Sequence, residues 1–204
     1  MPNRSNAIGK IGIFYIGLLL LPGLTGCAPA IVAGGATAVA AVGERRGPQE
    51  FVEDNWVAVK IRSLYLQSDS VSPGNINVSV YRGRVLLTGT ASSEIEIAEA
   101  IRIAKEVRGA WSVHSELKVQ YATVAEITED SVISNKVKLA LLAEQEVRGL
   151  DIHVETTKGV VYLLGSARSV EERDRAIRAA RQVSNVREVV SYIDIDKQAY
   201  PVSK

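Results

Sequence analysis

The chain has 204 residues, of which 47% are hydrophobic and 23% are charged, and its formal net charge is +1. These proportions are those of an ordinary globular protein, and they exclude both a disordered chain and a strongly basic nucleic-acid-binding protein. Aromatic residues make up only 5%, which leaves no evident stacking surface for bases, so we expect no nucleic-acid partner.

The first 26 residues have the layout of a bacterial export signal. Arg4 and Lys10 precede an apolar run over residues 11–21, which is about half of the roughly 20 residues that a membrane-spanning helix needs. The sequence Leu24-Thr25-Gly26-Cys27 follows, and it resembles the lipobox, in which the cysteine is acylated. We therefore predict a lipoprotein signal peptide over residues 1–26 and a covalent lipid, palmitate included, on Cys27.

Acylation of Cys27 bears on both location and chemistry. Burial of an acyl chain contributes about 0.8 kcal/mol per CH₂, so several chains hold a protein at a membrane essentially permanently. Because Cys27 is the only cysteine, its acylation leaves no disulfide and no thiolate for the rest of the chain. Ala28 rather than an aspartate follows it, which in such lipoproteins permits transfer to the outer membrane. We expect an outer-membrane protein that is lipid-anchored and faces the periplasm.

Residues 27–49 connect this anchor to the remainder of the chain. Residues 31–43 are mostly Ala, Gly and Val, and such low complexity is typical of a tether. The same apolar tract could instead pack on the membrane surface, and the sequence leaves both readings open.

An internal repeat organises the rest of the chain. Two segments superimpose without a gap at a shift of 76 positions, which brings Gly83 onto Gly159 and Gly89 onto Gly165. A shift of this length is too long for a solenoid unit and predicts two related domains in tandem. We place the first domain at residues 50–122 and the second at residues 126–196, with a C-terminal tail over 197–204.

Each copy shows the same order of expected elements, α-β-β-α-β. A helical stripe comes first, formed by Val57, Ile61, Leu64 and Tyr65 or by Ile133, Val137, Ala140 and Leu141. Ser131 or Asp130 is the expected N-cap of the second of these helices. Two alternating strands follow, joined by a hairpin in which Gly83 or Gly159 supplies a positive φ. Ser93 and Ser169 are expected to cap a second helix, and a last alternating strand runs over residues 113–119 or 189–195.

The motifs Gly83-Arg84-Val85-Leu86-Leu87-Thr88-Gly89 and Gly159-Val160-Val161-Tyr162-Leu163-Leu164-Gly165, in this order of elements, resemble those of the BON domain. The resemblance covers nearly all of the chain after the tether. It implies an α+β fold of two tandem BON domains, each a two-layer sandwich in which two helices cover a three-stranded mixed sheet. With the lipobox, the chain resembles dual-BON outer-membrane lipoproteins more than soluble two-BON stress proteins.

Residues that could carry catalysis are sparse. His114 and His153 do not coincide under the repeat shift, and neither has a Cys or His partner at ligand spacing. The carboxylate pairs Glu171-Glu172 and Asp194-Asp196 are expected on solvated surfaces. The arginine-rich segment over residues 173–181 could contact anionic lipid, but interleaved acidic residues favour ordinary ion pairs. We expect no enzyme, no metal site and no cofactor beyond the lipid.

The outward side of the first helix in the second copy is the best candidate site. Once its core stripe is assigned, Val132, Leu139 and Leu142 fall outside, beside Asn135 and Lys138. In dual-BON outer-membrane lipoproteins this helix binds anionic phospholipid. The resemblance therefore implies that Val132, Asn135, Lys136, Lys138 and Leu139 bind phosphatidylglycerol or cardiolipin.

One residue departs from that pattern, because the family has a tryptophan where this chain has Val132. A tryptophan stands instead in the first copy, at Trp56, with Val59 and Leu66 also outward. An alternative is that these outer faces pack the two domains together.

The leading hypothesis is a non-enzymatic lipoprotein that supports envelope integrity by binding anionic phospholipid at the inner leaflet through its second BON domain. The rival is a lipid-anchored adaptor that binds envelope proteins such as the outer-membrane assembly machinery. The sequence leaves oligomeric state and domain orientation open.

Overall fold

The computed structural model describes residues 47–196, and these belong to one compact unit. The predicted signal peptide, Cys27, almost all of the predicted tether and the tail over 197–204 lie outside the described residues.

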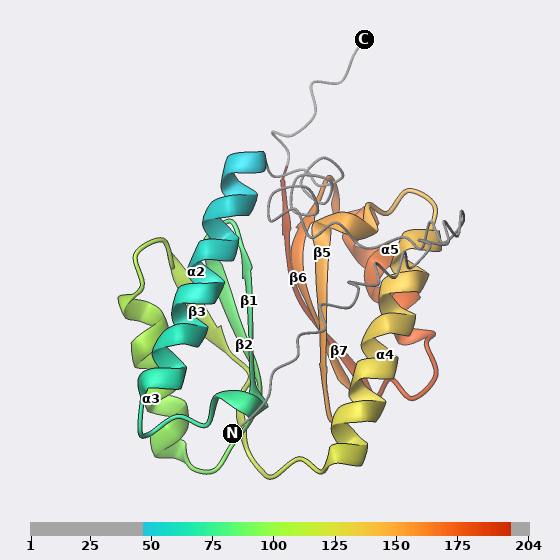
Figure 1. The fold of residues 1–204 in the computed structure, drawn as a ribbon. Coiled ribbons are helices and arrows are strands. Elements are labelled where there is room, and N and C mark those ends of the chain that lie inside the picture. Colours follow the sequence, from blue (N-terminus) through green and yellow to red (C-terminus); the bar gives the residue numbers. More distant parts are fainter. Residues whose placement is uncertain (1–46, 197–204) are drawn as a thin grey trace, which may run out of the picture. The chain divides into compact units, whose positions relative to one another are not determined.

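The first domain contains a helix, a hairpin, a second helix and a final strand in two pieces. Its elements are α2 (Pro48–Gln67), the short 3₁₀ helix η1 (Pro73–Asn75), β1 (Ile76–Tyr81), β2 (Arg84–Ala91), α3 (Glu94–Glu106), β3 (Ser112–Ser115) and β4 (Lys118–Val119). β1 pairs antiparallel with β2, whereas β3 and β4 pair parallel with it. The result is a mixed sheet with α2 and α3 on one face (Figure 1).

The second domain repeats this arrangement. Its elements are α4 (Val124–Ala143), η2 (Gly149–Asp151), β5 (Ile152–Thr157), β6 (Val160–Ala167), α5 (Val170–Arg181) and β7 (Glu188–Ile195). The strand order is β5-β6-β7, with an antiparallel and then a parallel pair, and α4 and α5 cover one face (Figure 1). The predicted α+β fold of two α-β-β-α-β domains is confirmed.

The hairpins have the tight turns that the glycines predict. Tyr81 pairs with Arg84, which leaves a two-residue loop in which Arg82 has φ 49° and Gly83 has φ 70°. Two successive positive φ values define a type I′ turn, whose twist matches that of the flanking strands. Lys158 and Gly159 repeat this geometry with φ 51° and 74°.

Gly89 and Gly165 have a different purpose from the turn glycines. Each lies within its strand, opposite the first residue of the preceding strand, Ile76 or Ile152. A Cβ on Gly89 would lie 2.0 Å from the carbonyl oxygen of Asn75, and one on Gly165 would lie 2.0 Å from that of Asp151. Only glycine admits this close backbone approach.

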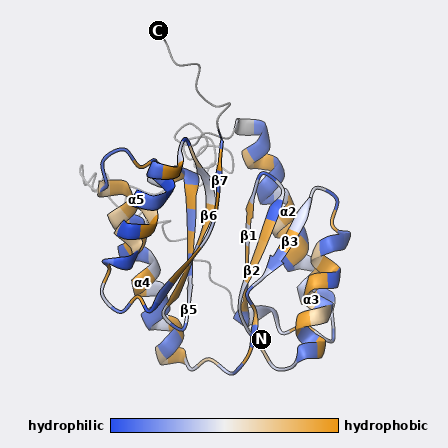
Figure 2. Cartoon of the chain, turned by 180° about the vertical axis from the view of Figure 1, so that it is seen from behind, coloured by the Kyte–Doolittle hydropathy of each residue, from blue (hydrophilic) through white to orange (hydrophobic). Residues whose placement is uncertain are grey.

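Each domain has its own hydrophobic core between helices and sheet. The expected stripes lie there: Val57, Ile61 and Tyr65 are buried in the first core, and Ile133, Val137 and Leu141 are buried in the second. Ser93 and Ser169 cap α3 and α5 as predicted, each accepting a hydrogen bond from the backbone three residues on. In Figure 2 the strands β2 and β6 are hydrophobic along much of their length.

The last strand of the first domain is interrupted, unlike the continuous strand that the sequence predicts. β3 and β4 keep the same register against β2, so only the pairing at Glu116 and Leu117 is lost. Leu117 is buried in the core, whereas Val119, predicted to face inward, is exposed. In the second domain, β7 runs without a break.

Candidate functional site

The helix α4 begins earlier than its apolar stripe suggests. Thr123 is its N-cap, and Thr123 and Glu126 bond each other's backbone in a capping box. The predicted caps are therefore wrong. Ser131 instead donates to the carbonyl of Ile127, and Asp130 accepts the backbone N–H groups of Lys158 and Gly159 at 2.7 and 2.8 Å.

The outward side of α4 exposes apolar side chains to solvent. Val132, Leu139 and Leu142 are 46%, 67% and 54% exposed. Val132 and Leu139 lie seven residues apart, which is about two turns at 3.6 residues per turn, so they share one line along the helix. Together with Leu142 they form an exposed apolar patch of the kind that normally contacts a partner.

Polar and basic residues border this patch. Asn135 lies between Val132 and Leu139 on the same side, and it is exposed. At about 100° per residue, Lys136 and Lys138 fall on opposite flanks of the patch, and both are exposed. The five residues predicted to bind phospholipid are thus brought together on one surface, which we call the α4 outer face.

The equivalent side of α2 in the first domain is also exposed and more apolar. Val52, Trp56, Val59 and Leu66 are all at least half exposed. Lys60 occupies the position that Lys136 has in α4. These residues form the α2 outer face.

The alternative that these outer faces pack the two domains together is wrong. The domains meet through the sheet faces that lie opposite the helices. A cluster of Tyr81, Leu86, Tyr162 and Leu164 is almost completely buried there. Every second residue of β2 and β6 points to this cluster, while the residues between them, such as Val85 and Leu163, point to the cores.

The contact between the domains has approximate two-fold symmetry, because residues meet their own repeat equivalents. Ser79 donates to Glu155, 76 positions away, at 3.2 Å. Tyr192 donates to Glu116, again 76 positions away. Leu86 and its equivalent Tyr162 share the buried cluster. Such a self-complementary contact is isologous, as in a two-fold dimer.

One side of this contact is closed by ion pairs. Arg82, from the turn after β1, pairs with Asp196 across the contact and with Glu50 within its own domain. Arg84 pairs with Asp194 at 3.0 Å and donates to the carbonyls of Tyr192 and Gly165.

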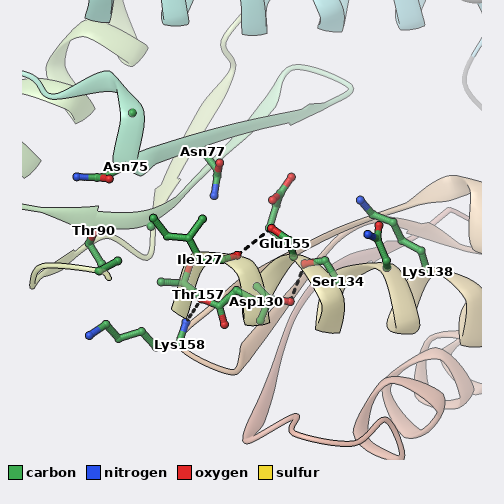
Figure 3. Close-up of a pocket in the computed structure, with 16 residues that line it drawn as sticks. Asn75, Asn77, Thr90, Ile127, Asp130, Ser134, Lys138, Glu155, Thr157 and Lys158 are labelled. Carbon is green, nitrogen blue, oxygen red and sulfur yellow. Dashed lines mark hydrogen bonds between the residues drawn. The ribbon is translucent and has the colours of Figure 1, made fainter. Parts of the chain in front are cut away.

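The other side of the contact is an open groove between β1 and η1 of the first domain and α4 and β5 of the second. It encloses about 380 Å³. Polar side chains from both domains line it, including Asn77, Asn135, Lys138, Glu155 and Thr157 (Figure 3). Asn135 and Lys138 therefore belong both to the α4 outer face and to the groove.

Glu155 contributes a half-buried carboxyl to the wall of this groove. Burial raises the pKa of its carboxyl, against the opposing effects of the Lys138 charge, the Ser79 hydrogen bond and the Arg62 charge.

The buried carboxylates have structural partners. Asp54 accepts the amides of Arg82 and Gly83, just as Asp130 does in the second domain. Glu96 and Glu172, also 76 positions apart, each bind backbone amides of two loops. Glu172, which the sequence suggested on a solvated surface, is in fact buried.

The two histidines lie at the domain contact. His114 packs against Tyr192, with ring centroids 4.9 Å apart, and His153 meets Tyr81 edge-on at 6.0 Å. Within residues 47–196, no group of three His, Cys, Asp or Glu side chains could hold a metal ion.

The arginines of α5 are partly engaged by acidic neighbours. Arg173 pairs with Asp174 and Arg175 with Glu146. Across the described part of the chain, no helix combines the length and apolar character needed to cross a bilayer.

Comparison with known proteins identifies the repeat. The family model "BON domain" matches residues 53–121 and 129–197. Osmotically-inducible protein Y of Escherichia coli is 32% identical over 142 residues, covering 68% of this chain and 71% of that protein.

The outer membrane lipoprotein DolP of Haemophilus influenzae is 28% identical over 176 residues, covering 84% of this chain and 91% of that protein. Among solved structures, the C-terminal domain of CdsD, a structural protein of the type III secretion system of Chlamydia trachomatis, is 13% identical. That likeness covers 70% of this chain and 67% of that chain with a TM-score of 0.29, which is too low to carry an argument.

Proposed function

Because the chain belongs to the BON-domain family, we propose that it is a non-enzymatic, lipid-anchored protein of the bacterial cell envelope that supports envelope integrity. The similarity to an outer membrane lipoprotein over 84% of the chain, together with the lipobox at Cys27, supports an anchor in the outer membrane facing the periplasm.

We further propose that the α4 outer face binds anionic phospholipid, phosphatidylglycerol or cardiolipin, at the inner leaflet. The observation that carries this proposal is one exposed surface on which Val132 and Leu139 lie between Lys136 and Lys138. Apolar side chains enter the acyl boundary of a bilayer while lysines stay among the headgroups. A lysine near an anionic surface contributes about 1 kcal/mol.

The anchor and the α4 outer face would act together. Acyl chains on Cys27 raise the effective concentration of a weak contact by making it intramolecular. The α4 outer face then needs only modest affinity for lipid to remain bound.

Vesicle binding tests this proposal with the mature chain, residues 27–204, in which Cys27→Ser removes the anchor. We expect salt-sensitive binding to phosphatidylcholine vesicles that contain phosphatidylglycerol, and none to phosphatidylcholine alone. Reversing the charge of two lysines with Lys136→Glu and Lys138→Glu should weaken binding by about 30-fold or more, from about 1 kcal/mol per lysine. Lys60→Glu reverses the lysine that corresponds to Lys136 in the first domain, and it is the control for the single substitution Lys136→Glu.

Equal binding to charged and neutral vesicles, or an equal loss from Lys60→Glu, would contradict the proposal. The adaptor function makes a different prediction for the same surface. Photo-crosslinkers at positions 132 and 139 of the lipidated chain in cells should then give one dominant protein adduct rather than lipid adducts.

A further inference from the structure

The groove exists because the bulky aromatic side chains on one side of the domain contact have smaller equivalents on the other side. On the closed side, the hydroxyl of Tyr81 lies 2.8 Å from Ser166 Oγ, and its ring packs against His153. The repeat equivalents of these three residues on the open side are Thr157, Thr90 and Asn77, and all three line the groove. A tyrosine ring fills the closed side, and a threonine leaves the open side hollow.

The ion pair between Arg82 and Asp196 on the closed side also has no equivalent on the open side. Arg82 and Asp196 attract each other on the closed side. The corresponding residues are Lys158 and Gln120, and the Nζ of Lys158 pairs instead with Glu126 of its own domain, at 3.3 Å. The open side therefore lacks the arginine–aspartate pair that holds its counterpart shut.

One polar atom in the groove lacks a protein partner. Thr157 is 8% exposed, and its Oγ1 makes no hydrogen bond. A buried hydroxyl without a partner costs free energy, and this oxygen is covered by the protein rather than exposed to the groove. The nearby amides of Asn77 and Asn135, the ammonium of Lys138 and the carboxyl of Glu155 offer hydrogen bonds (Figure 3).

We propose that this groove binds a glycerophosphate group, the polar head of the anionic phospholipid that the α4 outer face holds. The inference rests on the proposed function and adds a headgroup site to it. Asn135 and Lys138 connect the two surfaces, because both belong to the α4 outer face and line the groove. A lipid with its acyl chains at Leu139 can therefore present its head to the groove.

The lining residues match the chemistry of this group. A phosphodiester accepts hydrogen bonds from the ammonium of Lys138 and from asparagine amides. Glycerol hydroxyls donate to the carboxyl of Glu155, which lines the groove. A site that pairs with hydroxyls discriminates against a ligand without them, because its own polar groups are then left unpaired.

The test replaces Thr157 with its larger equivalent, Thr157→Tyr, in the mature chain with Cys27→Ser. Vesicles contain either phosphatidylglycerol or phosphatidylmethanol, which carries the same single charge without glycerol hydroxyls. We expect the unsubstituted protein to bind phosphatidylglycerol at least fivefold more tightly. Thr157→Tyr should lose this preference and keep its binding to phosphatidylmethanol, whereas Thr157→Val should leave the groove open and retain most of the preference.

Soluble glycerophosphoglycerol, added as a competitor, separates the lipid from a free metabolite. If it inhibits binding to phosphatidylglycerol vesicles but not to phosphatidylmethanol vesicles, the headgroup site is supported. If the protein binds the competitor but binds phosphatidylglycerol and phosphatidylmethanol vesicles equally, the groove is assigned to a free glycerophosphate and the lipid assignment is overturned.

Other outcomes separate this inference from the proposed function. A Thr157→Tyr protein with an unchanged unfolding temperature and an unchanged preference would overturn the groove site but leave the α4 outer face standing. Absence of binding to either anionic vesicle would overturn both. If Thr157→Tyr does not fold, Asn77→His narrows the groove from the first domain and should reduce the same preference.

Discussion

Two neighbouring leucines offer a direct test of the domain contact. Leu163 and Leu164 are both 0% exposed, yet Leu163 lies in the core of the second domain and Leu164 lies in the cluster between the domains. Leu164→Ala removes the equivalent of about three methylene groups, worth about 2.4 kcal/mol at 0.8 kcal/mol each. The cavity left behind raises the expected loss of unfolding free energy to about 2–5 kcal/mol.

Urea and thermal unfolding measure this loss. For a chain of this size each kcal/mol lowers Tm by about 2–4 °C, so the substitution should lower Tm by about 5 °C or more. Leu163→Ala should cost a similar amount. If the domains did not pack through their sheets, Leu164 would be a surface residue, and a cost below about 0.5 kcal/mol would refute the contact.

Two further substitutions test local features. Gly89→Ala places a Cβ 2.0 Å from the Asn75 carbonyl oxygen at a φ of +115°, so it should lower the free energy of unfolding by more than about 2 kcal/mol. Gly74 has open space around it, so Gly74→Ala should leave Tm unchanged. Equal effects of the two substitutions would contradict the predicted clash. The pKa of Glu155 is raised chiefly by burial, so its contribution to stability falls as pH rises from its unfolded pKa through its folded pKa. Glu155→Gln should therefore unfold at a higher temperature than the unsubstituted protein at pH 8 but not at pH 4, and a constant difference would contradict that sign.

The sequence was sufficient to predict the fold because each expected element has its own local signal. The apolar spacing of Val57, Ile61 and Tyr65, the turn glycine at position 83 and the cap at Ser93 depend only on near neighbours in the chain. The repeat then supplied a second, independent reading of the same order.

The start of α4 and the domain contact were harder to predict. Thr123, which starts the capping box, lies nearly three turns before the first residue of the apolar stripe, Ile133, so periodicity alone missed it. The signal for the sheet contact was present, since Leu86 and Leu164 make β2 and β6 apolar on both faces, as in strands buried on both sides. It could not be assigned to a partner from one sequence, because either copy or another protein could cover that face.

The helical spacing and the family resemblance together pointed to the five α4 residues, but neither gave a sign of the groove. That feature depends on which residues of one repeat lie opposite those of the other. Thr157 became significant only when its position could be compared with that of Tyr81 across the contact.

Because the contact is nearly two-fold symmetric, two separate identical domains could not have formed one closed side and one open side. In a dimer of identical single domains, a tyrosine at this position would close both sides and a threonine would open both. Joining the copies in one chain frees each side to change alone. Duplication and fusion therefore give this protein one closed side that holds the domains together and one open side available for a ligand.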